Sequence, residues 1–177
     1  MTPGSRPLTE VTWRWVTFDE LTVDALYRVM ALRQRVFVIE QNCVYLDADG
    51  HDAVCIHGLG ESGGELVAYA RLLPRDVAYP TPSIGRVVTS PTARGSGLGR
   101  TVVEQAIAEC GRRFPGEAIT IGAQLYLLAF YESFGFVGAG NPYDEDGIMH
   151  IEMIRTSSAD NLIEVHVRKH RSGHPGR

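Results

Sequence analysis

The sequence lacks the features of a disulfide-rich, secreted or membrane-spanning protein. Its 177 residues include three cysteines, Cys43, Cys55 and Cys110, with no Cys-x-x-Cys or Cys/His spacing. An odd number of scattered cysteines does not make a disulfide framework and suits a reducing compartment. No apolar run approaches the roughly 20 residues that span a bilayer, and residues 1–20 hold no apolar signal segment. We therefore expect a soluble cytoplasmic protein without a membrane partner.

The chain also lacks a surplus of positive charge. It has 17 Lys and Arg against 21 Asp and Glu, which gives a net charge of −4. Proteins that bind nucleic acid usually carry a basic excess, so we expect no nucleic-acid partner. A small anionic ligand needs only a local positive site and is not excluded. The sequence leaves a monomer and a homodimer equally open.

The length is that of one domain. Residues 1–10 contain two prolines and a glycine and are expected to be a flexible end, residues 11–156 form the domain, and residues 157–177 are a polar, partly disordered tail. Three histidines fall four residues apart in this tail: His166, His170 and His174. Gly173 and Pro175 argue against a helix that would align them. We therefore expect no metal site.

Apolar periodicity predicts alternating strands and helices. Strands are expected at 11–18, 53–59, 65–73, 84–89, 118–123, 136–139 and 148–155, and helices from about 22 to 37, 98 to 110 and 125 to 134. Gly111 is a plausible stop signal for the second helix, and the third is expected to be buried. The segment Asp47–Asp52 lacks the glycine and glutamate positions of a calcium-binding loop, so a solvated turn is expected.

The most informative stretch is the glycine-rich loop between strand 84–89 and the second helix. Glycines at 95, 97 and 99 follow Ser90-Pro91 and bring bare backbone to a helix start, where unpaired amides and the helix dipole attract anions. The spacing does not fit G-x-G-x-x-G, and arginine stands where a Walker loop needs lysine. Neither motif fits, so on its spacing alone the loop is either an anion site of another kind or an ordinary glycine-rich turn that enters a helix.

The pattern Arg94-x-x-Gly97-x-Gly99 resembles the acyl-CoA pyrophosphate loop of the GNAT superfamily, the GCN5-related N-acetyltransferases. A second resemblance runs from Tyr131 to Gly135-Phe136, although Gln124 stands where that family usually has asparagine, and Leu127 where it has alanine. The stretches 32–45, 47–52, 69–71 and 145–150 are similar to the ElaA-like subgroup.

This resemblance implies an α/β (α+β) GNAT fold, with a mixed central sheet of about six to seven strands flanked by about four helices. It implies an N-acetyltransferase that transfers acetyl from acetyl-CoA to a primary amine of a small molecule or peptide, by direct attack in a ternary complex and without a metal. A non-catalytic acyl-CoA binding or sensing module is the alternative. Another acyltransferase, such as a homoserine-lactone synthase, is a third hypothesis.

The resemblance also assigns residues to the cofactor. Main-chain groups of strand 84–89 would pair with the pantetheine amides, and amides of the glycine-rich loop would hold the pyrophosphate. The expected cofactor-binding residues are Val87, Val88, Thr89, Arg94, Gly95, Ser96, Gly97, Leu98, Gly99, Arg100, Gln124 and Tyr131.

Catalysis needs a proton for the leaving thiolate and a base for the amine, because a lysine-like amine has a pKa of about 10.4. Tyr131 is the candidate acid, with Tyr126 as its rival. Strand 84–89 contains no glutamate, so His150 is the first candidate base, since imidazole takes up protons near neutral pH. Glu40 and Glu145 follow it. The expected substrate-binding residues are Glu40, Arg71, Arg86 and Glu145.

Overall fold

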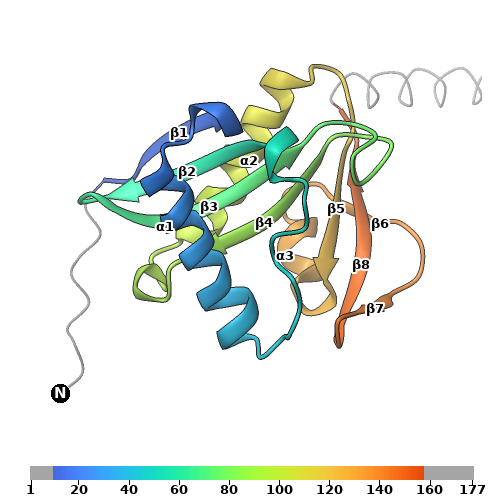
Figure 1. Ribbon diagram of the computed structural model, residues 1–177. Coiled ribbons are helices and arrows are strands. Elements are labelled where there is room, and N and C mark those ends of the chain that lie inside the picture. Colours follow the sequence, from blue (N-terminus) through green and yellow to red (C-terminus); the bar gives the residue numbers. More distant parts are fainter. Residues whose placement is uncertain (1–9, 158–177) are drawn as a thin grey trace, which may run out of the picture.

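The structure is a computed structural model that describes residues 10–157, in which eight strands form one mixed sheet (Figure 1). Along the sheet the strands are β1 (Thr12–Thr17), β2 (Ile56–Ser62), β3 (Glu65–Leu73), β4 (Ser83–Thr89), β5 (Ile119–Gln124), β8 (Ile148–Arg155) and β6 (Val137–Gly138), and β7 (Tyr143–Glu145) pairs with β8. Only β4 and β5 are parallel neighbours in this described part. The predicted α/β class with a mixed sheet is confirmed. The additional strand is β7, which lies between the expected strands 136–139 and 148–155.

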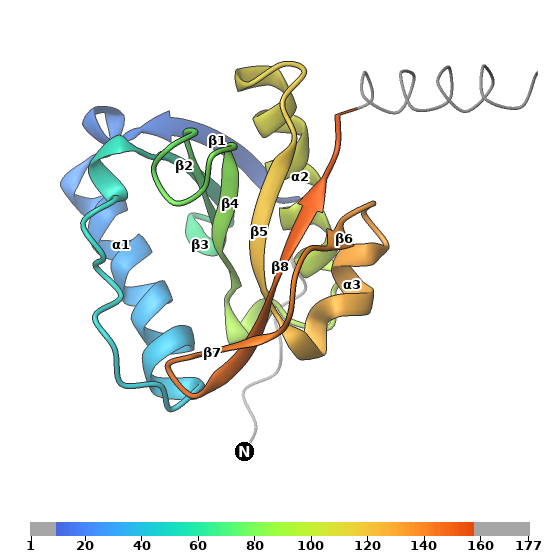
Figure 2. The ribbon, with the colours of Figure 1, turned by 90° about the vertical axis from the view of Figure 1, so that its right-hand side faces the viewer.

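Helices cover both faces of the sheet (Figure 2). Helix α1 (Val23–Arg33) lies on one face, while α2 (Leu98–Arg113) and α3 (Leu128–Glu132) lie on the other. Helix α1 begins after Thr22, whose hydroxyl accepts the Ala25 N–H at 3.1 Å and caps the helix. It continues into a π-helical stretch, Gln34–Glu40. No helix within residues 10–157 has both the length and the apolar character needed to cross a membrane.

Two glycines of β2 make room for the tryptophans of the edge strand. Trp13 pairs with Gly60 and Trp15 with Gly58 in the antiparallel register. A Cβ at Gly58 would come within 2.3 Å of the Trp15 ring, and one at Gly60 within 2.8 Å of the Trp13 ring. Each indole therefore packs directly over backbone, and β2 extends through Gly60 to Ser62, further than the sequence predicts.

Two helix boundaries differ from the sequence prediction. Helix α2 passes through Gly111 and ends at Arg113, because the ladder continues to the Phe114 N–H, which bonds to the Cys110 carbonyl at 2.8 Å. The segment expected to be one buried helix is instead a 3-10 turn at Leu125–Leu127 followed by the short α3. Within these two elements only Tyr131 is buried, since they cover the sheet from outside with one face in solvent.

The central feature of the sheet is the divergence of β4 from β5. Within the described residues their register contains a single pair, Ser83 with Thr120, supported by the Thr120 N–H bond to the Pro82 carbonyl at 3.0 Å. Beyond this point the two strands separate, as Figure 1 shows. The sheet is thus divided into a half that contains β1–β4 and a half that contains β5–β8.

A buried ion-pair network holds the segment after α1 against the first half of the sheet. Arg33 is fully buried and binds Asp47 and Asp52, each at 2.7 Å. Arg71 of β3 binds Asp52 at 2.8 Å and also Asp49, while Arg86 of β4 binds Asp47 at 2.7 Å and Asp49 at 3.2 Å; together these six residues form the Arg/Asp network. The prediction of a solvated turn at Asp47–Asp52 is wrong. Its carboxylates are drawn inward by three arginines from three separate elements.

The arginines keep the carboxylates of this network ionised. Burial alone would raise the pKa of Asp49, but the hydrogen bonds from Arg71 and the His51 N–H, together with the charges of Arg71 and Arg86, outweigh this effect and lower that pKa. Burial also opposes ionisation of Asp52, and hydrogen bonds from Arg33 and Arg71 lower its pKa. Because the folded pKa values lie below the unfolded value of about 3.9, this stabilisation is present above that pH and is lost as the pH falls through the folded pKa values.

Gly111→Ala is expected to stabilise the protein by about 0.5–1 kcal/mol, because alanine restricts the unfolded chain and favours a helix interior. A Cβ at Gly111 meets no atom within 4 Å, so the substitution adds no clash. The free energy of unfolding from urea titration measures this change. A loss of stability would mean that α2 ends at Gly111 in solution.

Asp47→Ala is expected to cost about 3–5 kcal/mol, because it leaves the Arg33 guanidinium buried with half of its compensating charge removed. Asp24→Ala is the control, since it removes an exposed partner of Arg28 and should cost less than about 1 kcal/mol. Urea titrations at pH 7 and pH 3 measure both costs. Equal effects of the two substitutions would contradict a structural role for the network.

Candidate active site

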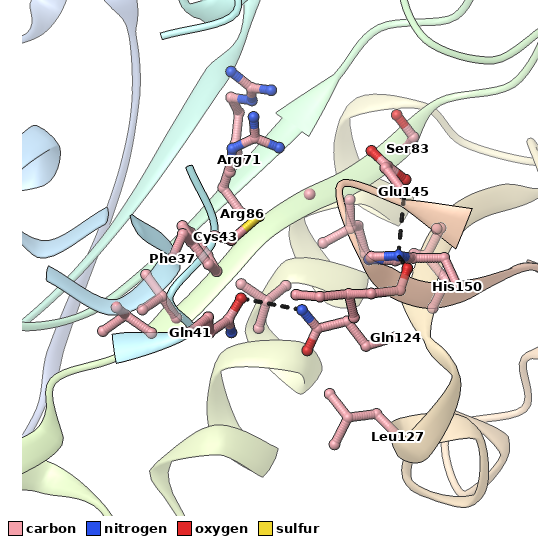
Figure 3. A pocket seen from close by; sticks show the side chains of 18 of the residues that line it. Phe37, Gln41, Cys43, Arg71, Ser83, Arg86, Gln124, Leu127, Glu145 and His150 are labelled. Carbon is pink, nitrogen blue, oxygen red and sulfur yellow. Dashed lines mark hydrogen bonds and ion pairs between the residues drawn. The ribbon is translucent and has the colours of Figure 1, made fainter. Parts of the chain in front are cut away.

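The divergence of β4 and β5 opens into a cavity of about 760 Å³. Its walls come from both halves of the sheet, from the π-helical stretch and the segment that follows it, and from the β7–β8 turn. The segments 37–45 and 144–146 both contribute residues to its wall. Figure 3 shows residues of both halves facing one another across it.

The glycine-rich loop forms one end of the cavity. Gly95 and Gly97 have φ values of +78° and +82°, which favour glycine, and α2 starts at the next residue, Leu98. Gly99 does not have a positive φ, so its backbone would accept another residue. A Cβ placed there would contact no atom within 4 Å. Gly99 lines the cavity. The lack of a side chain at this position therefore leaves open space beside the unpaired amides of the first helical turn.

The two arginines of this loop have different surroundings. Arg94 lines the cavity and forms an exposed ion pair with Glu40 at 2.6 Å. Arg100 instead lies over the Phe134 ring, 4.5 Å from its centre, and donates to the Ser133 hydroxyl at 2.7 Å. Glu40, expected to bind the acceptor, is thus placed at the glycine-rich end, beside Arg94.

Strand β4 is irregular where it borders the cavity. Tyr69 pairs with Val88 but Arg71 pairs with Gly85, so one residue of β3 faces two of β4. Arg86 occupies the bulge with φ +51°, held there by its two aspartate partners. A bulge of this kind turns main-chain groups away from the neighbouring strand. The following residues, Val87, Val88 and Thr89, all line the cavity.

Two side-chain contacts bridge the cavity. Gln124, at the end of β5, donates from Nε2 to Gln41 Oε1 at 3.2 Å, as the dashed line in Figure 3 marks. Cys43 Sγ lies 3.3 Å from the Asp146 carbonyl of the β7–β8 turn. The segment 41–43 thus spans the gap between the two halves of the sheet. The sequence assigned Gln124 to the cofactor but gave no specific role to Gln41.

Tyr131 approaches the cavity from α3 and is nine-tenths buried. Its ring packs edge-on against Phe130 and Phe136. Burial raises the pKa of Tyr131 to about 12, with a smaller contribution from Tyr126. The hydroxyl therefore keeps its proton at neutral pH and can act as a donor but not as a base. Tyr126 is 73% exposed and donates to Gln124 Oε1 at 2.6 Å.

His150 enters the cavity from β8 in a defined tautomer. Its Nδ1 lies 2.8 Å from the Ile148 carbonyl, and because a carbonyl only accepts, Nδ1 must carry the proton. This leaves the lone pair on Nε2 of the neutral ring. The ring stacks on Tyr143, and Nδ1 lies 4.0 Å from Glu145 Oε2. His150 can thus accept a proton, with Glu145 close enough to stabilise the resulting charge.

The other expected substrate residues, Arg71 and Arg86, also line the cavity, but their guanidinium groups are bound in the Arg/Asp network. Their charge is therefore matched by protein carboxylates. Ser83, for which the sequence predicts no role, lines the cavity beside the pairing with Thr120. A serine at the start of a strand carries no signal in the sequence that would distinguish it from an ordinary surface residue.

No group of three or more His, Cys, Asp or Glu side chains between residues 10 and 157 is arranged to hold a metal ion. The three histidines of the tail, His166, His170 and His174, lie outside the described residues.

The chain is similar to a known domain family and to known proteins. The acetyltransferase (GNAT) domain family matches residues 55–157. The chain is 47% identical over 146 residues to the UPF0039 protein sll0451 of Synechocystis, covering 82% of this chain and 95% of that protein.

Two crystal structures are similar throughout. Escherichia coli ElaA has 40% identity and a TM-score of 0.78, with 82% of this chain and 99% of that chain covered. An acyl-CoA N-acyltransferase from Pseudomonas aeruginosa has 38% identity and a TM-score of 0.80, with 83% and 100% covered. With a shared domain family, a shared fold and relatives of this identity along nearly their whole length, the chain belongs to the GNAT acetyltransferase family and is similar to ElaA.

Proposed function

We propose that this protein transfers an acetyl group from acetyl-CoA to the primary amine of a small molecule or peptide, in a ternary complex. The observation that carries the proposal is the cavity between β4 and β5. It extends from Gly99 and Arg94 at the glycine-rich loop to Tyr131 and His150. A long cofactor with a phosphate at one end and a thioester at the other fits such a shape.

The cofactor would use the backbone of both cavity walls. Amides from Gly95 to Arg100 would hold the pyrophosphate at the start of α2, where the helix dipole favours an anion. Main-chain groups of Val87 and Thr89 would pair with the pantetheine amides, since β5 has already diverged from β4 at this level. Gln124 would exchange its bond with Gln41 for one to the cofactor.

The chemistry needs two proton transfers. The amine nitrogen attacks the thioester carbonyl carbon, the carbon–sulfur bond breaks, and CoA leaves as a thiolate. His150 Nε2 takes the proton from the amine, and the Tyr131 hydroxyl gives its proton to the thiolate sulfur. The tautomer of His150 and the raised pKa of Tyr131 support this division between base and acid.

The proposal also specifies the acyl donor and the cellular compartment. The similar Pseudomonas aeruginosa protein is described as an acyl-CoA N-acyltransferase, which supports a CoA thioester as donor. We propose acetyl as the group transferred and the cytoplasm as the compartment. Cys43, Cys55 and Cys110 are free and buried, which suits a reducing environment.

Release of free CoA thiol from acetyl-CoA, measured with a panel of primary amines, tests the activity. Turnover above the rate of hydrolysis with at least one amine supports the transferase. Saturable CoA binding without thiol release from any amine would favour the alternative, a non-catalytic acyl-CoA binding module. A preference for longer acyl donors would contradict acetyl as the transferred group.

Gly99→Leu is expected to weaken CoA binding at least tenfold, because its side chain would fill the space that the pyrophosphate needs beside the helix amides. Gly111→Leu is the matched control, since Gly111 lies in the same helix and also has open space around its Cβ position. Titration calorimetry with CoA measures both affinities. If Gly99→Leu binds CoA as tightly as Gly111→Leu does, the loop does not hold the cofactor.

Tyr131→Phe is expected to lower kcat by about 10²–10⁴-fold, the usual contribution of a general acid, while the affinity for CoA changes little. Phenylalanine retains the ring contacts with Phe130 and Phe136, so the fold should persist. Initial rates of thiol release and CoA titration separate the two effects. Turnover equal to that of the unsubstituted protein would assign Tyr131 a packing role alone.

A further inference from the structure

Ser83 has a buried hydroxyl that the protein itself does not satisfy. The residue is 2% exposed and lines the cavity beside the point where β4 and β5 last pair. Among residues 10–157, Ser83 Oγ is one of two buried side-chain polar atoms without a hydrogen-bond partner. Leaving a buried hydroxyl unpaired is unfavourable, and such groups in native proteins usually face a ligand or water.

The charges around the cavity show which kind of group fits beside Ser83. Arg71, Arg86 and Arg94 are each paired with carboxylates of the protein. Glu145 lines the same cavity, and within the described residues no arginine or lysine binds it. The cavity therefore offers unmatched negative charge at Glu145 and no unmatched positive charge among these three arginines.

These groups are also separated in space. Figure 3 shows Ser83, Glu145 and His150 on one side of the pocket, and Arg71 and Arg86 on the other. A cation on the Ser83 side would thus approach the Glu145 carboxylate, whose neighbours are the Tyr143 and His150 side chains, and remain away from the guanidinium groups. An anionic group in the same place would be repelled by Glu145.

We infer that the Ser83 hydroxyl and the Glu145 carboxylate bind a second, non-reacting amino group of the acceptor, so that the preferred acceptor is an aliphatic diamine. This inference rests on the N-acetyltransferase function proposed above. One amine is presented to His150 for acetylation. The other donates hydrogen bonds to Ser83 Oγ and is neutralised by Glu145. A monoamine would leave the Ser83 hydroxyl unpaired and gain nothing from the carboxylate.

Three acceptors of equal chain length test the inference: 1,4-diaminobutane, 4-amino-1-butanol and n-butylamine. With acetyl-CoA as donor, kcat/KM for the diamine is expected to exceed that for butylamine by about tenfold to hundredfold, the range of a charged hydrogen bond. The amino alcohol should lie between them, because it can pair with Ser83 but carries no charge for Glu145. Equal values for diamine and butylamine, or an amino alcohol that equals the diamine, would overturn the diamine assignment.

Two variants locate the site. Ser83→Ala and Glu145→Gln should each lower the ratio of kcat/KM for diamine over butylamine about tenfold. Glu65→Gln is the control, since it removes the same charge from an exposed position at the start of β3 and should leave the ratio unchanged. A ratio that falls equally in all three variants would indicate a general effect of net charge and contradict the assignment.

Binding provides a readout that does not depend on turnover. Calorimetric titration of 1,4-diaminobutane into the CoA-loaded protein should give saturable binding that Ser83→Ala weakens about tenfold. If no amine is acetylated but this binding and its loss are observed, the proposed catalysis fails and the diamine site stands. If amines are acetylated but the diamine binds no better than butylamine, the catalysis stands and the diamine site is wrong.

Discussion

The rest of the structure depends on the way that two parallel strands separate. Backbone N–H and C=O groups inside a protein need partners, and a sheet normally supplies them from the adjacent strand. After the pair formed by Ser83 and Thr120, β4 and β5 no longer supply each other. The bulge at Arg86 turns further groups of β4 out of the ladder. The fold therefore maintains a strip of backbone hydrogen-bonding capacity along a cavity, which is suited to a ligand that has amide groups of its own.

A cavity of this kind persists only if its walls are held apart without the ligand. On one side the Arg/Asp network anchors the segment after α1, with Arg33 buried at the end of the helix. A buried network of ions contributes little net stability compared with apolar packing, but removing one partner is costly, so it fixes geometry. The cross-cavity contacts of Gln41 and Cys43 are single bonds to the other half. The wall that the Arg/Asp network holds is thus rigid. The contacts of Gln41 and Cys43 across the cavity can be replaced by contacts with a ligand.

The sequence was sufficient to predict the fold class and the glycine-rich loop. Apolar periodicity and the loop at 95–99 are local signals, and local signals survive in the fold, whereas the mixed sheet was expected from the family resemblance. The Arg/Asp network was missed because it joins residues from 33 to 86, and nothing in the segment 47–52 distinguishes an aspartate in solvent from one that meets an arginine. The position of Ser83 in the cavity likewise depends on where β5 pairs with β4. The local sequence around Ser83 does not specify that pairing.

The division of the sheet also separates the two tasks of the proposed reaction. The groups expected to hold the cofactor lie mainly on β4 and the start of α2, whereas Tyr131 and His150 belong to elements packed on or within the half that contains β5–β8. A change in the angle between the halves would therefore move Tyr131 and His150 together relative to the groups proposed to hold the cofactor. Within the described residues, β4 and β5 join the two halves only at the pair of Ser83 and Thr120, and Ser83 also provides the unsatisfied hydroxyl. Acceptor binding at Ser83 would thus act where the two halves join.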